Sequence, residues 1–195
     1  MKYLCLLLFL ILSSCKSDPI SIKQIPCKEI ATLEDNYRDH KIVKDSFRIS
    51  IPIEFEILIN SSKVKYITWN VSIDNKILDK DFYDYDFYIN ENKIKRIYQL
   101  ESNSLSNNKK IMALVKVNNY LVSKLEASKL IAKYTNNKSL DDLKSNSVIE
   151  LTTYDKFRID NKSIINQFNK TTDSISFKVT RGEKYFFLLD KKINW

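Results

Sequence analysis

The segment Ser46-Phe-Arg-Ile-Ser-Ile-Pro-Ile-Glu-Phe-Glu-Ile-Leu-Ile59 decides the fold of this chain. Its apolar residues recur at every second position from Phe47 to Ile59, and mostly polar residues separate them. Successive side chains of a strand point to opposite faces, so this period of two predicts a long strand with one buried face. Pro52 has no amide hydrogen and therefore requires an edge position, a bulge or a break in that strand.

Further strands are predicted on the C-terminal side of this segment. The same alternation covers residues 66–73 and 83–89, and a fourth strand is expected from Lys93 to Glu101. Residues 111–117 are apolar on both faces, as in a central strand. The polar run Ser102–Lys110 is typical of a hairpin loop, so the pattern indicates a meander of antiparallel strands.

Helical spacing appears on both sides of this meander. Ile30, Leu33 and Tyr37 lie at i, i+3 and i+7, which predicts a short helix after Pro26. Good helix formers without Gly or Pro predict a second helix over Leu121–Tyr134. Three more features are predicted further along: a capping box at 139–142, a strand over 148–154 and a short helix around 164–168.

The C-terminal region has the pattern of a β-hairpin. Two alternating stretches, 175–179 and 185–189, flank Gly182, the only glycine of the chain. We expect Gly182 to adopt a positive φ in the turn. The order of elements predicts an α+β fold: a largely antiparallel sheet, made of an N-terminal meander and a C-terminal hairpin, with packed helices. An all-β sandwich with short helices is the alternative.

Composition bounds the size and the chemistry of the protein. The chain has 195 residues, of which 44% are hydrophobic, and this fits one folded domain, which we expect over residues 28–195. A single glycine excludes glycine-rich phosphate loops, and one His with three Cys excludes sites built on two His or four Cys ligands. We therefore expect no metal and no cofactor. The net charge of +8 is spread along the chain without a basic stripe, so nucleic acid is not expected as a partner.

The N-terminus has the pattern of an export signal. Lys2 precedes the ten-residue apolar run Tyr3–Leu12, which is half the length that a membrane-spanning helix needs. The following Leu12-Ser13-Ser14-Cys15 resembles the lipobox of bacterial lipoproteins. An ordinary cleaved signal peptide with an incidental cysteine is the alternative.

The lipoprotein resemblance implies a processing route and a location. Residues 1–14 would be removed as the signal peptide, Cys15 would be the lipid attachment site, and residues 15–27 would form the lipidated cysteine and a tether. Acyl chains of this kind, such as palmitate, hold a domain at a bilayer through buried methylene groups. Lys16 occupies the position where the inner-membrane retention signal has Asp, so the resemblance implies the outer membrane of the cell envelope, on either its periplasmic or its surface face.

One acidic and aromatic stretch is a candidate ligand contact. Tyr83, Asp84, Tyr85 and Asp86 could bind a glycan or an envelope protein, because carboxylates hydrogen-bond hydroxyls and tyrosine rings pack on sugars. Asp84 and Asp86 would lie about 7 Å apart on one strand face, a separation near that of glycosidase carboxylates. A surface strand with solvated Asp and half-buried Tyr is the structural alternative.

No catalytic residue is assigned from the sequence. His40 could act as a general base beside Asp39 or Asp45, but nothing in the spacing selects a nucleophile. Cys27 has no intramolecular partner and no motif around it, so a structural role is expected. Three functions are consistent with these features: a noncatalytic envelope lipoprotein with a binding domain, a toxin-neutralising immunity or inhibitor lipoprotein, and an envelope glycan hydrolase.

Overall fold

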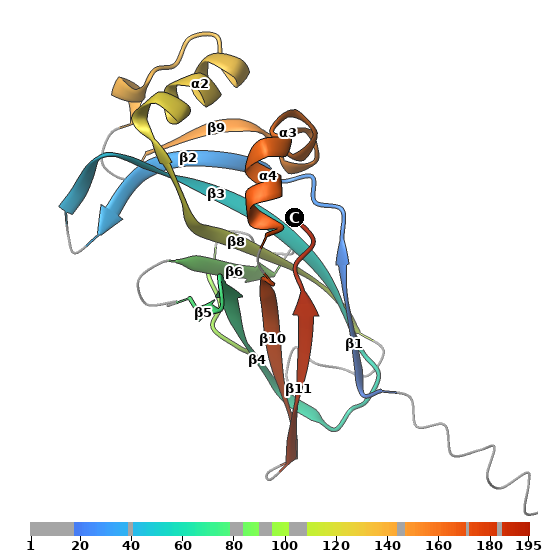
Figure 1. The fold of residues 1–195 in the computed structure, drawn as a ribbon. Coiled ribbons are helices and arrows are strands. Elements are labelled where there is room, and N and C mark those ends of the chain that lie inside the picture. The colour runs from blue at the N-terminus through green and yellow to red at the C-terminus, as the bar shows by residue number, and fades with distance from the viewer. Residues whose placement is uncertain are drawn as a thin grey trace, which may run out of the picture.

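The structure, a computed structural model, describes residues 18–38, 41–78, 84–89, 95–101, 109–143, 147–170, 172–182 and 185–195. Antiparallel strands dominate these residues, and they form two sheets (Figure 1). The fold is therefore largely antiparallel and sheet-rich, as predicted.

The larger sheet is built around one long strand, β3 (Lys41–Ile59). Strand β8 (Lys110–Ser123) pairs with one edge of β3 over most of its length, and β2 and β1 share the other edge. The strand order is β6-β8-β3-β2-β9, with β1 also on β3. The remaining bounds are β1 Ile20–Ile25, β2 Ile30–Arg38, β6 Tyr85–Ile89 and β9 Val148–Thr153.

Pro52 lies where β3 changes partners. Pairing with β2 ends at Ser50, and pairing with β1 begins at Glu54. On the other edge, the register with β8 shifts between Ile49 and Ile51. The strand thus continues through the proline next to a bulge, which is one of the positions that the missing amide hydrogen permits.

The smaller sheet has the order β11-β10-β4-β5, and β7 also pairs with β4. The hairpin of β10 and β11 turns at Gly182, whose φ is +62°, so the predicted left-handed glycine is confirmed. The bounds are β4 Val64–Ile73, β5 Lys76–Ile77, β7 Leu100–Glu101, β10 Ser174–Arg181 and β11 Tyr185–Lys192.

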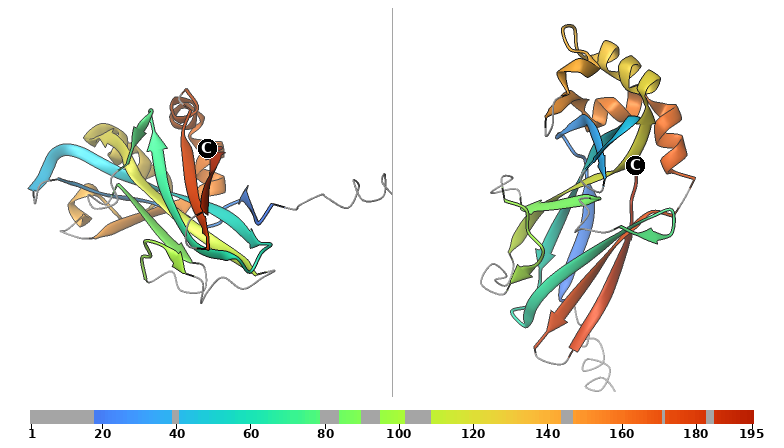
Figure 2. Two further views of the ribbon diagram at one scale, coloured as in Figure 1. Left: turned by 90° about the horizontal axis from the view of Figure 1, so that it is seen from below. Right: turned by 90° about the vertical axis from the view of Figure 1, so that its left-hand side faces the viewer.

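The two sheets share one hydrophobic core. Phe55 of β3 meets Phe177 of β10 edge-to-face, with ring centroids 5.8 Å apart, and Trp69 of β4 stacks on Phe87 of β6 at 3.6 Å. The residues of β3 with odd numbers from Ile49 to Ile59 are buried, as the period of two predicts. This facing of two sheets partly fits the sandwich alternative (Figure 2).

The helices gather at one end of the molecule, near β2 and β9 (Figure 1). Helix α2 (Lys124–Tyr134) begins with a capping box in which Ser123 and Glu126 bond each other's backbone amides. Helices α3 (Tyr154–Asp160) and α4 (Lys162–Phe168) follow β9. The short 3₁₀ helix η2 (Leu140–Asp142) carries the capping box predicted at 139–142.

Two structural predictions are wrong. Residues 30–37 belong to strand β2 instead of a helix, because Ala31 and Leu33 are both fully buried in the sheet while Ile30 is 38% exposed. The expected meander is also wrong: β4 leaves the larger sheet and pairs with β10, and β3 pairs instead with the distant β8.

Three boundaries differ from those predicted. Residues 121–123 extend β8, so the helix begins at Lys124, and the described part of 93–101 contains only the two-residue strand β7. The expected tether, 15–27, includes strand β1, whose Ile20 and Ile22 are buried against β3. Within that segment the ordered body thus begins well before residue 28.

Candidate functional site

The acidic and aromatic stretch at β6 serves the packing of the sheet. Tyr85 is 2% exposed, and its hydroxyl lies 3.5 Å from the carbonyl oxygen of Trp69 in the core. Asp84 accepts a hydrogen bond from the backbone amide of Asn118 through its carbonyl oxygen. Tyr83 lies outside the described residues. The buried ring of Tyr85 is closed to a ligand in this structure.

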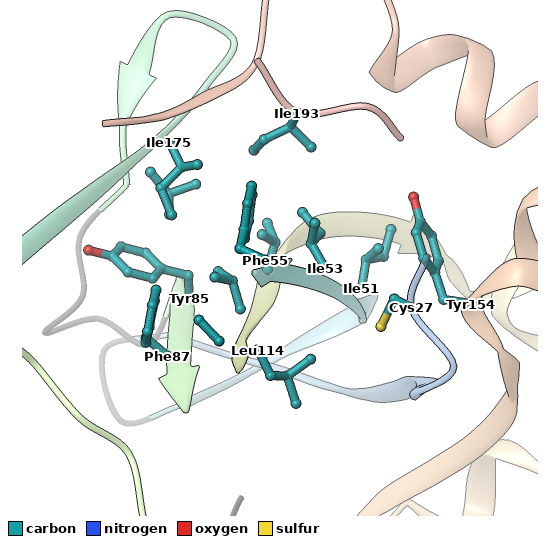
Figure 3. Close-up of a cluster of buried hydrophobic side chains, with 14 of the residues drawn as sticks. Cys27, Ile51, Ile53, Phe55, Tyr85, Phe87, Leu114, Tyr154, Ile175 and Ile193 are labelled. Atoms are coloured by element: carbon teal, nitrogen blue, oxygen red, sulfur yellow. The ribbon is translucent and has the colours of Figure 1, made fainter. Parts of the chain in front are cut away.

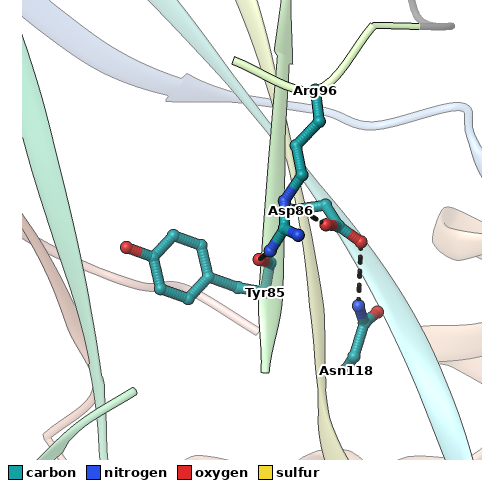
Figure 4. A network of polar contacts seen from close by, with 4 residues as sticks. All are labelled: Tyr85, Asp86, Arg96 and Asn118. Carbon is teal, nitrogen blue, oxygen red and sulfur yellow. Dashed lines mark hydrogen bonds and ion pairs between the residues drawn. The ribbon is translucent and has the colours of Figure 1, made fainter. Parts of the chain in front are cut away.

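Asp86 is held in a network of charged and polar groups (Figure 4). The Nε of Arg96 lies 2.6 Å from one carboxylate oxygen of Asp86, and the side-chain amide of Asn118 donates to the other at 3.0 Å. Arg96 also donates to the carbonyl oxygen of Tyr85 at 2.8 Å. The network, together with the hydrogen bond from the amide of Ile97 to the carbonyl oxygen of Phe87, joins Arg96 and Ile97 to β6, so Asp86 has structural partners.

Cys27 is a buried core residue next to Tyr154 (Figure 3). Burial removes solvation from the thiolate and raises the pKa of Cys27 to about 12, and burial also raises the pKa of the Tyr154 hydroxyl. A thiol with so high a pKa is a poor nucleophile at neutral pH, in agreement with the structural role expected for it. Cys15 and His40 lie outside the described residues.

A cavity of about 240 Å³ lies at the end of the core where α4 and the C-terminal segment meet the sheets. We name it the end pocket. It is lined by Ile51, Ile73, Asp74, Val117, Asn119, Tyr120, Gln167, Phe168, Asp173 and Trp195. The apolar floor comes from β3, β8 and β4. The polar groups come from β8, from the β4–β5 turn, from α4 and from Asp173, which directly precedes β10.

Three aromatic rings form one wall of the end pocket. Phe168 meets Tyr120 edge-to-face at 4.3 Å between ring centroids, and it meets Trp195 at 5.2 Å. The Tyr120 hydroxyl donates to the side-chain oxygen of Gln167 at 2.7 Å and thereby joins β8 to α4. Burial raises the pKa of Tyr120, so this hydroxyl stays protonated as a donor at neutral pH.

The buried carboxylate of Asp173 holds the pocket together. It is 2% exposed and accepts a hydrogen bond from the indole Nε1 of Trp195 at 2.7 Å and from the backbone amide of Asp74 at 3.0 Å. Asp74 and Asn75 both have positive φ in the two-residue turn between β4 and β5. Asp and Asn tolerate this conformation better than most residues, so the turn can present its amide to Asp173.

The chemistry of this lining selects a class of ligand. Amide and carboxylate groups offer hydrogen-bond partners for hydroxyls, and the aromatic wall offers an apolar surface. Among the described residues that line the pocket, the ionisable groups are Asp74, Asp173 and Tyr120, and none is a Lys or Arg. This part of the lining therefore does not favour an anion. Its volume suits one small ring of neutral, polar character.

Sequence reasoning missed this site because its residues come from segments that are far apart in the sequence. Tyr120 lies near the end of β8, Phe168 ends a helix, and Asp173 and Trp195 bracket the C-terminal hairpin. No spacing in the sequence brings them together. The sequence offers a weak signal for two of these residues: Asp173 lies between a predicted helix and a predicted strand, and Trp195 is the last residue.

The described residues contain neither a candidate metal cluster nor a helix that could span a membrane. In that part of the chain, no three His, Cys, Asp or Glu side chains are grouped so that they could hold a metal ion. None of the helices described there is both long and apolar enough to cross a membrane.

Comparison with known proteins finds no relative of this chain. No family model, no curated protein and no solved structure matches it.

Proposed function

We propose that this protein is a cell-envelope lipoprotein whose domain binds a small neutral saccharide in the end pocket without catalysis. The lipobox ending at Cys15 supports lipid anchoring, and the end pocket is the observation that supports binding. In this proposal, the sheets face each other as a sandwich with short helices at one end, and the pocket lies where that sandwich opens.

A saccharide ring matches the lining of the pocket. Its C–H face is apolar and packs on aromatic rings, while its hydroxyls need donors and acceptors in the plane of the ring. Phe168 and Tyr120 supply the apolar surface, and Asn119 and Gln167 supply amides. A phosphate or carboxylate ligand would instead meet the acidic Asp74 and Asp173.

Hydrolysis is less well supported than binding. A glycosidase needs one carboxylic acid that can give up a proton and a second carboxylate near the bond that breaks. Both side-chain oxygens of Asp173 already accept hydrogen bonds from N–H donors, and those of Asp86 are bound by Arg96 and Asn118. These carboxylates act as acceptors that hold the fold.

Trp195 supplies a direct test of saccharide binding. The chain has two tryptophans, and Trp69 is stacked in the core, so a Trp69→Phe variant reports from Trp195 alone. We expect neutral mono- and disaccharides of bacterial envelopes to shift this fluorescence in a saturable way. Removing the pocket amide by Asn119→Ala should weaken binding about threefold to tenfold, the usual effect of one neutral hydrogen bond.

A matched variant and a negative outcome complete this test. Asn70 is exposed on β4 and is not among the residues that line the pocket, so Asn70→Ala should leave the affinity unchanged. A panel of saccharides that leaves Trp195 fluorescence unaltered would overturn the binding proposal and favour the inhibitor hypothesis. Lipid anchoring is tested separately, by uptake of labelled palmitate, which Cys15→Ala should abolish.

A further inference from the structure

Exposed aromatic and basic residues gather at the end of the molecule where the β10–β11 hairpin turns. We name them the basic-aromatic tip and define it as the exposed Lys63, Lys65, Tyr66, Tyr185 and Phe186 together with the half-buried Arg181. Tyr185 is 79% exposed, Phe186 60% and Tyr66 46%. Phe186 and Tyr66 both flank Thr180 in register, so they lie on one face of the smaller sheet. Large side chains exposed together in this way mark an interaction surface.

Positive charge lies beside these aromatic residues and outnumbers the acidic neighbour Glu101, which pairs with Tyr66 across the sheet. Lys63, Lys65 and Arg181 line, together with Tyr185 and Phe186, a hollow of about 670 Å³. The Nζ of Lys178 lies 4.5 Å from the centroid of the Phe186 ring. Arg181 is half-buried and adds a third positive charge to the lining of this hollow.

The same end of the molecule is where the described chain begins. The side chain of Asn60 donates to the carbonyl oxygen of Asp18 at 3.0 Å, and its backbone amide donates to that of Pro19 at 2.8 Å. The amide of Gly182 donates to the carbonyl oxygen of Lys63 at 3.3 Å. These bonds join the first described residue, the β3–β4 turn and the hairpin turn at one end, as Figures 1 and 2 show.

Chain length places the predicted lipid close to this tip. Cys15 precedes Asp18 by three residues, and an extended chain spans at most about 3.6 Å per residue, so the two lie within about 11 Å of each other. A lipid on Cys15 would thus hold the tip against the headgroups. Rings that are apolar on one side and polar on the other, flanked by cations, are the side chains that settle at a membrane interface.

We propose that the basic-aromatic tip docks on the anionic headgroups of the bilayer that holds the lipid of Cys15. Docking fixes the orientation of the domain, with the tip on the membrane and helix α2 at the far end. The inference rests on the proposed lipid anchor, and it adds a second contact that the acyl chains do not supply. The anchor keeps the tip at a high effective concentration next to the membrane, so a second contact can form even where it is weak by itself.

Quenching of tryptophan by brominated lipid tests this docking. The acylated full chain is reconstituted in vesicles of phosphatidylcholine with brominated chains, with and without phosphatidylglycerol. A reporter is placed at the tip by Phe186→Trp, and a matched reporter is placed on α2 by Leu125→Trp, since Leu125 is 65% exposed at the other end. We expect quenching in the Phe186→Trp protein only, and stronger quenching when phosphatidylglycerol is present.

Charge variants separate docking from simple anchoring. The double variant Lys63→Gln/Lys65→Gln should reduce the docked fraction, with the docking constant falling about fivefold for each cation removed. The control Lys124→Gln/Lys129→Gln removes the same charge from exposed positions on α2 and should change nothing. If Phe186→Trp fails to fold, Leu188→Trp replaces it, because Leu188 is 58% exposed on the same face.

The outcomes distinguish the two proposals. A protein that incorporates no palmitate refutes the anchor. Acylated protein in which both reporters are quenched equally, or neither is, overturns the docking surface while the anchor stands. A tip reporter that lipid does not quench, but that crosslinks to a protein in isolated envelopes, also overturns it and assigns the surface to a protein partner.

Discussion

Replacing Asp173 should loosen the C-terminal closure of the end pocket. Among the described residues, its carboxylate accepts hydrogen bonds from the indole of Trp195 and from the backbone amide of Asp74, and its carbonyl oxygen accepts a third from the amide of Ile193. Asp173→Ala removes the two side-chain bonds and leaves the indole and the Asp74 amide without this acceptor. The third bond uses the backbone and is not removed by the substitution itself.

The expected cost follows from the charge of the acceptor. A hydrogen bond to a charged group contributes about 1.5–3 kcal/mol, so two contribute about 3–6 kcal/mol. Relief from burying the carboxylate at 2% exposure offsets part of this sum. We therefore expect Asp173→Ala to lower the free energy of unfolding by about 3 kcal/mol. With a urea slope of about 2 kcal/mol per molar, the midpoint should fall by about 1.5 M.

Urea titrations followed by far-UV circular dichroism measure this change without relying on tryptophan. A double-mutant cycle with Trp195→Phe should give a coupling energy of about 1.5–3 kcal/mol for the 2.7 Å bond. Glu150→Ala, at an exposed position of β9, should cost less than about 0.5 kcal/mol. A coupling energy near zero, or a loss below about 1 kcal/mol for Asp173→Ala, would refute the reasoning. If Asp173→Ala does not fold, Trp195→Phe alone should still lower the midpoint.

Two further predictions concern buried titratable groups. Burial raises the pKa of Cys27 from 9.0 to about 12, so between these pH values the folded state keeps a proton that the unfolded state releases. The contribution of Cys27 to the free energy of unfolding is therefore full below pH 9 and is lost as the pH rises toward 12. Unfolding free energies should therefore fall more steeply over that range in the wild type than in Cys27→Ala; parallel curves would contradict this. Burial also raises the pKa of Glu34, and this effect exceeds the opposite effect of Arg48, its neighbour across the sheet. The contribution of protonated Glu34 to the free energy of unfolding is therefore present below about pH 4.5 and is lost as the pH rises. Glu34→Gln should accordingly be more stable than the wild type at pH 7 and not at low pH, whereas a loss of stability at pH 7 would show that Arg48 dominates.

The positions of the strands can be predicted from the sequence, because a strand with one buried face has an apolar residue at every second position. Phe47–Ile59 and 66–73 meet this condition and became β3 and β4. The helix prediction for residues 30–37 is wrong because the spacing of their large apolar residues matches a helix, whereas the sheet buries the small Ala31 and leaves Ile30 exposed. Spacing among large residues cannot show that an alanine carries the buried face.

Strand partners and the pocket do not follow from the sequence for a different reason. Alternation gives the buried face of a strand and carries no information about which edge it meets, so the pairing of β3 with β8 could not be inferred. The pocket depends on those partners. Tyr120 reaches Phe168 only because β8 lies beside β3 and α4 packs next to them, and that arrangement is set by long-range packing.

The end pocket and the basic-aromatic tip are linked by one strand, which sets their separation. Asp173 directly precedes β10 and Gly182 directly follows it. Eight residues at about 3.3 Å each span about 26 Å, so a tip that rests on headgroups holds the pocket at about that height above them. With at most about 11 Å of chain between Cys15 and Asp18, the domain has little freedom to rise or turn over. The two proposals together therefore predict a ligand that lies within a few nanometres of the membrane, and a polar insertion between Cys15 and Asp18 should free the pocket from that height without altering its affinity for a soluble saccharide.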